Sequence, residues 1–181
     1  LREQMDAVVA AAEDADIEVF HGVEANVDAD GGLSVGDDVL ADLDVVIASP
    51  HSDLGMDREA ATERLVTAVE HPETDVLGHP TGRLINDRPG LSPDVERLAS
   101  AAADAETALE INANPHRLDL NDEAVRTAVE AGATVVINTD AHGVGELDFR
   151  RYGVHTARRG WAETDDVLNT LSVADLRSWL D

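Results

Sequence analysis

Five side chains of types that bind metal ions stand at the ends of short apolar runs in this sequence. They are Glu24, His51, His79, Asp140 and His142. Asp140 and His142 follow one run two positions apart, and such residues lie on one face of a strand, where they can reach a single ion. The chain has no cysteine, and carboxylate with imidazole suits zinc, manganese or iron better than calcium or magnesium. The sequence therefore predicts a shared metal site, in which Glu24 can bridge two cations that activate one water.

Five further residues are weaker candidates for roles around such a site. They are Arg83, Arg117, Glu110, Asn112 and Asn114. The two arginines can hold a phosphate, because guanidinium matches phosphate in a bidentate manner, or they can pair with the many nearby carboxylates. Glu110 can be a sixth ligand, a support for a ligand or a buried partner of an arginine. The two asparagines can orient ligands through hydrogen bonds or serve the turn that contains them.

The elements that must position these residues alternate between strand and helix. Strands are predicted at 17–23, 44–49, 75–79, 107–111 and 134–138. Helices are predicted at 2–15, 36–43, 57–70, after a cap at Ser92, from a cap at Asn121 to Gly132, at 146–151, and after caps at Thr164 and Ser172, with a strand-like segment at 152–157. Continuous apolar strands that alternate with helices indicate a parallel sheet covered on both faces. Ligands at the ends of several strands favour the rim of a (β/α) barrel over a doubly wound sheet, which gathers its ligands at one switch point.

Composition indicates one folded domain with an unusual charge. The 181 residues are 43% hydrophobic, and 38 acidic residues against 13 basic ones give a formal net charge of −25. Acids spread over the whole chain suit a protein of a high-salt environment, where screening shortens self-repulsion. Binding of DNA would then require high salt, metal ions or a local basic patch such as the arginines of 150–159. The scattered aromatics Tyr152, Trp161 and Trp179 are expected to pack in the protein rather than to stack on bases.

Apolar runs also bear on the location of the protein. None approaches the roughly 20 residues that span a bilayer, and no secretory signal opens the chain. We therefore expect a cytoplasmic protein without a membrane partner.

Several motifs of the chain resemble those of the PHP (polymerase and histidinol phosphatase) family. They are GVE at 22–24, ASPHS at 48–52, GHPTGR at 78–83, EINANPHRLDL at 110–120 and NTDAH at 138–142. Segments 61–65, 150–161 and 167–170 add a likeness to the PHP domain at the C-terminal end of bacterial and archaeal family X DNA polymerases. The resemblance implies an α/β fold, a distorted (β/α)7 TIM-like barrel with outer helices. It also implies a manganese- or zinc-dependent phosphoesterase, a 3′-to-5′ exonuclease that processes DNA 3′ ends in repair, with a polymerase domain upstream in the same chain.

The resemblance also assigns roles to the candidate ligands. Glu24 would bridge two metals, and His51 with His79 would complete one of them, while Asp140 would bind the second metal and His142 the third. Glu24 and Asp140 would thus be the catalytic carboxylates.

The HxH pair that opens the family pattern has no counterpart in this sequence. Residues 1–181 are therefore expected to be the C-terminal part of a PHP domain that lacks its first strands. We expect about one complete metal site instead of three, incomplete catalysis, and a composition like that of haloarchaeal proteins. Two alternatives stay open. One is a free-standing PHP phosphatase that acts on a small phosphate monoester, similar to histidinol phosphatase. The other is a non-catalytic remnant that binds metal or packs against a polymerase core.

Overall fold

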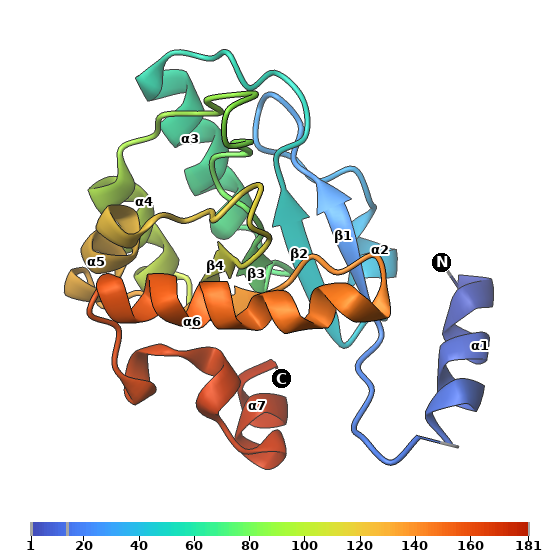
Figure 1. Cartoon of the computed structure of the whole chain (residues 1–181). Helices are drawn as coiled ribbons and strands as arrows, with labels where there is room; N and C mark the ends of the chain where they lie inside the picture. The colour runs from blue at the N-terminus through green and yellow to red at the C-terminus, as the bar shows by residue number, and fades with distance from the viewer. Residues whose placement is uncertain (1, 14, 181) are drawn as a thin grey trace.

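A parallel five-stranded sheet forms the centre of the computed structural model, which describes residues 2–13 and 15–180 (Figure 1). The strands are β1 (Gly22–Asn26), β2 (Val45–Ser49), β3 (Val76–Leu77), β4 (Ala108–Asn112) and β5 (Val135–Asn138). They lie side by side in sequence order, and every neighbouring pair is parallel. Strand order does not reverse, so the sheet is that of a partial (β/α) barrel and not of a doubly wound fold. The predicted fold class is confirmed.

Strand β1 begins later than the sequence predicts. Residues 17–21 are not part of the ladder, because β2 begins at Val45, which lies opposite Gly22. Ile17 is 75% exposed. Consequently Glu24 lies within the strand instead of just after it.

Helices α3 (Arg58–Val69), α4 (Val95–Asp104) and α5 (Asp122–Glu130) connect successive strands and cover one face of the sheet (Figure 1). Each helix has a side chain at its N-cap that accepts a backbone N–H three residues ahead. These caps are Asp57, Asp94 and Asn121. The predicted cap at Asn121 is confirmed. The predicted cap at Ser92 is wrong, because Asp94 takes that place and α4 begins one residue after it.

The two faces of the sheet differ in chemistry. Alternate residues of a strand point to opposite faces. The outer face packs on α3, α4 and α5 through Ala48, Leu77, Leu109, Ile111 and Val135. The inner face has an apolar floor, made of Val76, Ala108, Val136 and Leu168 with Ile47, Leu176 and Trp179. Towards the C-terminal ends of the strands the inner face becomes polar, so each apolar run leads from the core to the site described below.

Helix α1 (Arg2–Ala12) stands apart from the sheet in Figure 1, and α2 (Asp37–Leu40) precedes β2. None of the described side chains of α1 is buried, and Val9 is 61% exposed. The predicted helix is confirmed, but its apolar stripe is not part of the core. The predicted range 2–15 includes Asp14, which lies outside the described residues.

Residues 144–159 differ most from the prediction. The 3₁₀ helix η1 (Val144–Phe149) leads into α6 (Arg150–Arg159), so the predicted strand-like segment 152–157 is wrong. Its buried residues, Gly153, Thr156 and Ala157, recur at helical spacing. A Cβ at Gly153 would lie 2.5 Å from Ile137 Cγ2, so the glycine lets α6 pack directly on the sheet. Trp161 follows α6 and is 67% exposed, so the expectation that it packs inside is also wrong.

The last segments of the described chain cover the free edge of β5 and the apolar floor. They are η2 (Thr164–Asp166), η3 (Leu168–Thr170) and α7 (Val173–Leu180). Ser172 accepts a hydrogen bond from the N–H of Asp175, which confirms it as a helix cap, whereas Glu163 rather than Thr164 caps η2. Asn169 Oδ1 accepts the N–H of Ile137 at 2.6 Å, and its Nδ2 donates to the Ile137 oxygen at 3.1 Å. The amide thus takes the place of a neighbouring strand. None of the described helices is both long and apolar enough to cross a membrane.

Candidate metal centre

Glu24, within β1, comes together with His51 and His79, which follow the C-terminal ends of β2 and β3. Glu24 Oε1 lies 3.0 Å from His79 Nε2 and 3.5 Å from His51 Nε2. One ligand atom from each residue lies within 4.8 Å of the others. Two atoms bound tetrahedrally at roughly 2.1 Å from one ion are about 3.4 Å apart, so the spacing and the donor types fit one transition metal ion.

His79 is the best fixed of these three side chains. Its side chain is 3% exposed, and its backbone φ is 25°, in the left-handed region that costs free energy for a residue with a Cβ. A Cβ at Gly78 would lie 2.3 Å from Ser49 Oγ, so only glycine lets the chain enter this turn beside β2. The N–H of His79 donates to Glu110 Oε2 at 2.5 Å. The ring is therefore held in place before any ion binds.

The three groups also shift one another's pKa values. The hydrogen bond with His79, aided by one with Ser49 and by the charges of His79 and His51, lowers the pKa of Glu24 to about 2, against the effect of burial. Burial disfavours the imidazolium of His79, but the hydrogen bond with Glu24 and the nearby carboxylates outweigh it and raise its pKa. Burial lowers the pKa of His51. At neutral pH His51 is thus a neutral ligand, while His79 keeps its proton to a higher pH than an isolated histidine, and a metal ion would displace that proton.

Glu110 lies under His79 and is 4% exposed. Besides the His79 N–H, its carboxylate accepts Asn138 Nδ2 at 2.9 Å and Asn112 Nδ2 at 3.3 Å. Burial raises the pKa of Glu110. These contacts favour the supporting role over an ion pair with arginine. Asn114 Oδ1 accepts the N–H of His116, which favours its role in the turn.

Asp140 and His142 lie farther along the rim. Asp140 Oδ2 is 3.2 Å from Arg117 Nε, and Asn112 Nδ2 also donates to it at 3.3 Å. His142 is 83% exposed, and its Nδ1 lies 3.8 Å from Asp140 Oδ1. Within residues 2–13 and 15–180, neither joins the group of Glu24, His51 and His79. Their roles as ligands of further metals stay predictions.

Two arginines link the loops around the centre. Arg83 Nε donates to the Arg117 oxygen at 2.8 Å, and its Nη2 donates to the Leu118 oxygen. Arg83 therefore ties the loop after β3 to the loop after β4. Arg117 points towards the centre, where its charge contributes to the lowered pKa of His51. Its Nη1 has no hydrogen-bond partner among the described residues.

Two residues with structural roles at the site were missed from sequence. Arg64 is 1% exposed and donates to the oxygens of Asp28 and Ser52 at 2.8 and 2.9 Å, and to the Val27 oxygen at 2.5 Å. It follows Ala61 by three positions in the apolar stripe of α3, which is the signal that could have revealed it. Asp119 is fully buried and accepts the N–H and the hydroxyl of Thr81. The quoted motif at 110–120 contains it.

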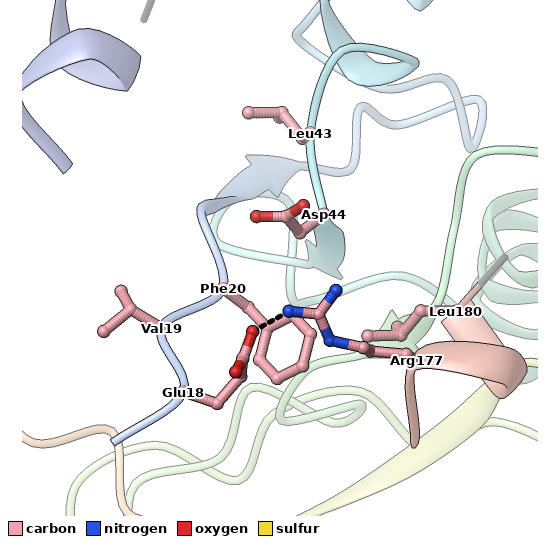
Figure 2. A pocket seen from close by; sticks show the side chains of 7 residues that line it. All are labelled: Glu18, Val19, Phe20, Leu43, Asp44, Arg177 and Leu180. Atoms are coloured by element: carbon pink, nitrogen blue, oxygen red, sulfur yellow. Dashed lines mark hydrogen bonds and ion pairs between the residues drawn. The ribbon is translucent and has the colours of Figure 1, made fainter. Parts of the chain in front are cut away.

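The centre opens into a cavity of about 440 Å³. Its polar lining consists of Glu24, His79, Glu110, Asn112, Asn138, Thr139 and Asp140. Another cavity, of about 220 Å³, lies at the opposite ends of the strands, and Figure 2 shows Arg177 of α7 paired with Glu18 there. That cavity is lined by Glu18 and Asp44 but by no histidine. The mixed carboxylate and imidazole ligands are thus gathered at the C-terminal rim.

Comparison with known proteins identifies relatives of two kinds. The DNA polymerase/3′-5′ exonuclease PolX of Bacillus subtilis is 44% identical over 178 residues, which are 98% of this chain and 31% of that protein. A probable phosphatase of Shewanella sp. strain ANA-3 is 31% identical over 133 residues, 68% of this chain and 50% of that protein. A probable phosphatase of Thermoanaerobacter sp. strain X514 is 27% identical over 174 residues, 91% of this chain and 68% of that protein. The chain thus spans about a third of PolX and about half of the Shewanella phosphatase. No protein-family model matches the chain.

Proposed function

Because the chain belongs to the family of the DNA polymerase/3′-5′ exonuclease PolX, in the part that resembles a PHP domain, we propose that it acts as a metal-dependent phosphoesterase module. The proposed reaction is hydrolysis of phosphodiester bonds at the 3′ end of DNA. The observation that carries the proposal is the group of Glu24, His51 and His79, whose spacing fits one metal ion at the rim where barrel enzymes place their catalytic residues. Manganese or zinc suits this donor set.

The residues of the chain divide the work at this centre. A divalent ion held by Glu24, His51 and His79 would supply a Lewis acid for the phosphate and lower the pKa of a water. Arg117 would hold a phosphate oxygen, and the support is that its Nη1 has no hydrogen-bond partner among the described residues. Asp140 orients Arg117 through its ion pair. If Asp140 binds a second metal, as the PHP likeness implies, the same carboxylate must exchange the guanidinium for the ion.

The experiment compares residues 1–181 with the product of the whole gene. Both are incubated with Mn²⁺ and a 5′-labelled single-stranded oligonucleotide, and products are separated by length. We expect shortening from the 3′ end by the whole gene product that stops with EDTA. We expect residues 1–181 to bind about one metal ion and to act at least about 100-fold more slowly, because one site lacks the second cation of a two-metal clamp. If the whole gene product does not shorten the oligonucleotide, the proposed exonuclease activity is wrong. If residues 1–181 digest it robustly, the proposal that they hold only one incomplete site is wrong.

A phosphatase that acts on a small phosphate monoester is the second candidate, because two of the relatives reported above are named as probable phosphatases. The same assay separates the two functions if p-nitrophenyl phosphate replaces the oligonucleotide. Hydrolysis of the monoester without digestion of DNA would favour the phosphatase. Metal uptake without either activity would favour the non-catalytic remnant.

We further propose that the protein works in the cytoplasm at high salt. The support is the net charge of −25 with acids spread along the whole chain. Raising KCl from about 0.1 M to about 3 M shortens the screening length from roughly 10 Å to below 3 Å, so the melting temperature should rise by at least about 5 °C. Thermal melts followed by circular dichroism test this, with sucrose at equal water activity as the control. A melting temperature independent of KCl would contradict the proposal.

A further inference from the structure

Helix α6 carries a concentration of positive charge that stands out in this acidic chain. It contains four of the 13 basic residues and no acidic residue. One face of α6 presents Tyr152, His155, Thr156 and Arg159, at positions i, i+3, i+4 and i+7. This face lines a groove of about 300 Å³, whose other wall is made of Arg83, Leu118, Asn121 and Asp122. Of the four arginines of α6, Arg159 lines this groove, together with Arg83 and His155.

The groups in the groove are accessible and held in place. His155 and Arg159 are exposed, while Gly153 and Ala157 on the other side of α6 are buried against the sheet and α5. Arg159 Nε and Nη2 both bind Asp122 Oδ2, at 2.8 and 2.6 Å. This pair fixes the guanidinium at the mouth of the groove, and its 73% exposed side chain keeps further N–H donors facing solvent.

The groove is linked to the metal centre through contacts of two arginines. Arg83, in its wall, follows His79 by four residues and donates to the Arg117 oxygen, and Arg117 pairs with Asp140 in the central cavity. These contacts connect Arg83, which shares the groove with Arg159, to Arg117 beside the proposed reaction site. One aromatic ring, of Tyr152, lines the groove, and a second, of Trp161, follows α6 outside it. Tyr152 is half-buried under Arg151, and Trp161 is exposed under Arg126 at 4.2 Å.

We propose that this groove binds the phosphate backbone of a single-stranded nucleic acid, a few nucleotides away from the end held at the metal centre. The identity of the ligand rests on the proposed function, whereas the position of the groove rests on the charges and contacts of α6. Cationic groups in a groove whose wall also contains the ring of Tyr152 match a single strand, which combines a row of phosphates with exposed bases. Elsewhere the acidic surface repels the strand, so the groove also selects where it lies.

The test measures binding separately from catalysis. A fluorescein-labelled oligothymidylate of twelve nucleotides is titrated in EDTA with residues 1–181, and anisotropy is recorded at several KCl concentrations. The double variant His155→Gln and Arg159→Gln should bind about tenfold more weakly, because charged hydrogen bonds to phosphate are lost. The slope of log affinity against log salt should fall by about 0.7 to 1 per lost phosphate contact.

The matched control is Arg97→Gln, which removes one exposed arginine of α4 that pairs with Glu59 and Glu63. It should leave affinity and slope unchanged. Three results would each overturn the proposal that this groove binds a nucleic acid. They are an equal loss of affinity in both variants, no loss of affinity in the double variant, and no binding by the parent chain. Circular dichroism melts verify that the variants are folded. Because binding is measured without metal, a whole gene product that fails to digest DNA would overturn the exonuclease, whereas normal binding by the double variant would overturn the groove alone.

Discussion

Replacing Glu24 with glutamine should weaken Mn²⁺ binding by residues 1–181 by at least about 100-fold. The variant keeps the size of the side chain but removes the anionic oxygen that lies 3.0 Å from His79 Nε2 and 3.5 Å from His51 Nε2. Two histidines alone lack the charge and the third donor that a stable site needs. Isothermal titration calorimetry measures the loss. The control is Glu130→Gln on α5, which breaks an exposed pair with Arg126 and should leave metal binding unchanged. Unchanged binding by the Glu24 variant would exclude it as a ligand.

The pH dependence of the same binding has a defined sign. Glu24, with a pKa of about 2, stays ionised throughout the neutral range. The pKa of His79 is raised above its ordinary 6.5, so a proton on His79 competes with the metal up to that raised value. The affinity should therefore rise by about tenfold per pH unit while one proton is displaced, and level off above the pKa of His79. A pH-independent affinity between 5 and 7 would contradict this competition.

Replacing Arg64 with leucine should lower the free energy of unfolding by about 3 kcal/mol, since it removes three hydrogen bonds to backbone oxygens, of which the one to Val27 is buried. Two of these oxygens, of Val27 and Asp28, follow the strand of Glu24, and the third, of Ser52, follows His51. The segments that follow Glu24 and His51 would lose their common support, so Mn²⁺ affinity should fall as well. Urea unfolding and calorimetry give the two quantities.

A matched core variant separates support of the ligands from general stability. Leu65→Ala, next to Arg64 on α3, removes a fully buried side chain at a cost of about 2–5 kcal/mol. At equal loss of stability, the Arg64→Leu variant should bind Mn²⁺ at least about tenfold more weakly than the Leu65→Ala variant. Arg64→Lys keeps the charge without the planar fork and should recover only part of the affinity. If the Arg64→Leu and Leu65→Ala variants bind Mn²⁺ with equal affinity, Arg64 contributes only to stability and does not support the metal ligands.

The order of strands and helices and the group of Glu24, His51 and His79 could be predicted from the sequence, because both depend on local patterns. Apolar runs alternate with helical stripes, and parallel strands in sequence order bring their C-terminal ends to one rim. Glu24, His51 and His79 lie on three adjacent strands or just after them, so this topology alone makes them neighbours. Their contact did not require knowledge of the loops.

The parts that sequence did not predict depend on contacts between distant segments. Segment 152–157 contains tyrosine, valine and threonine, which favour strands, but the sheet accepts it only as a helix that packs through Gly153 and Ala157. Arg64 looks like a solvated residue until the loops after β1 and β2 cover it. The pairing of Asp140 with Arg117 depends on how the loop after β4 folds over β5, and no local pattern encodes that approach.

The side-chain amide of Asn169 limits how this sheet can grow. Exposed backbone N–H and C=O groups on an edge strand recruit further strands, which is how sheets extend and how proteins aggregate. At β5 the groups of Ile137 are already bonded by Asn169, so an added strand would have to displace that amide. At the other end, the described residues place no strand beside β1. Addition of a strand therefore has one favoured direction, at the edge next to Glu24, and any protein segment that pairs there would arrive directly beside the metal ligands.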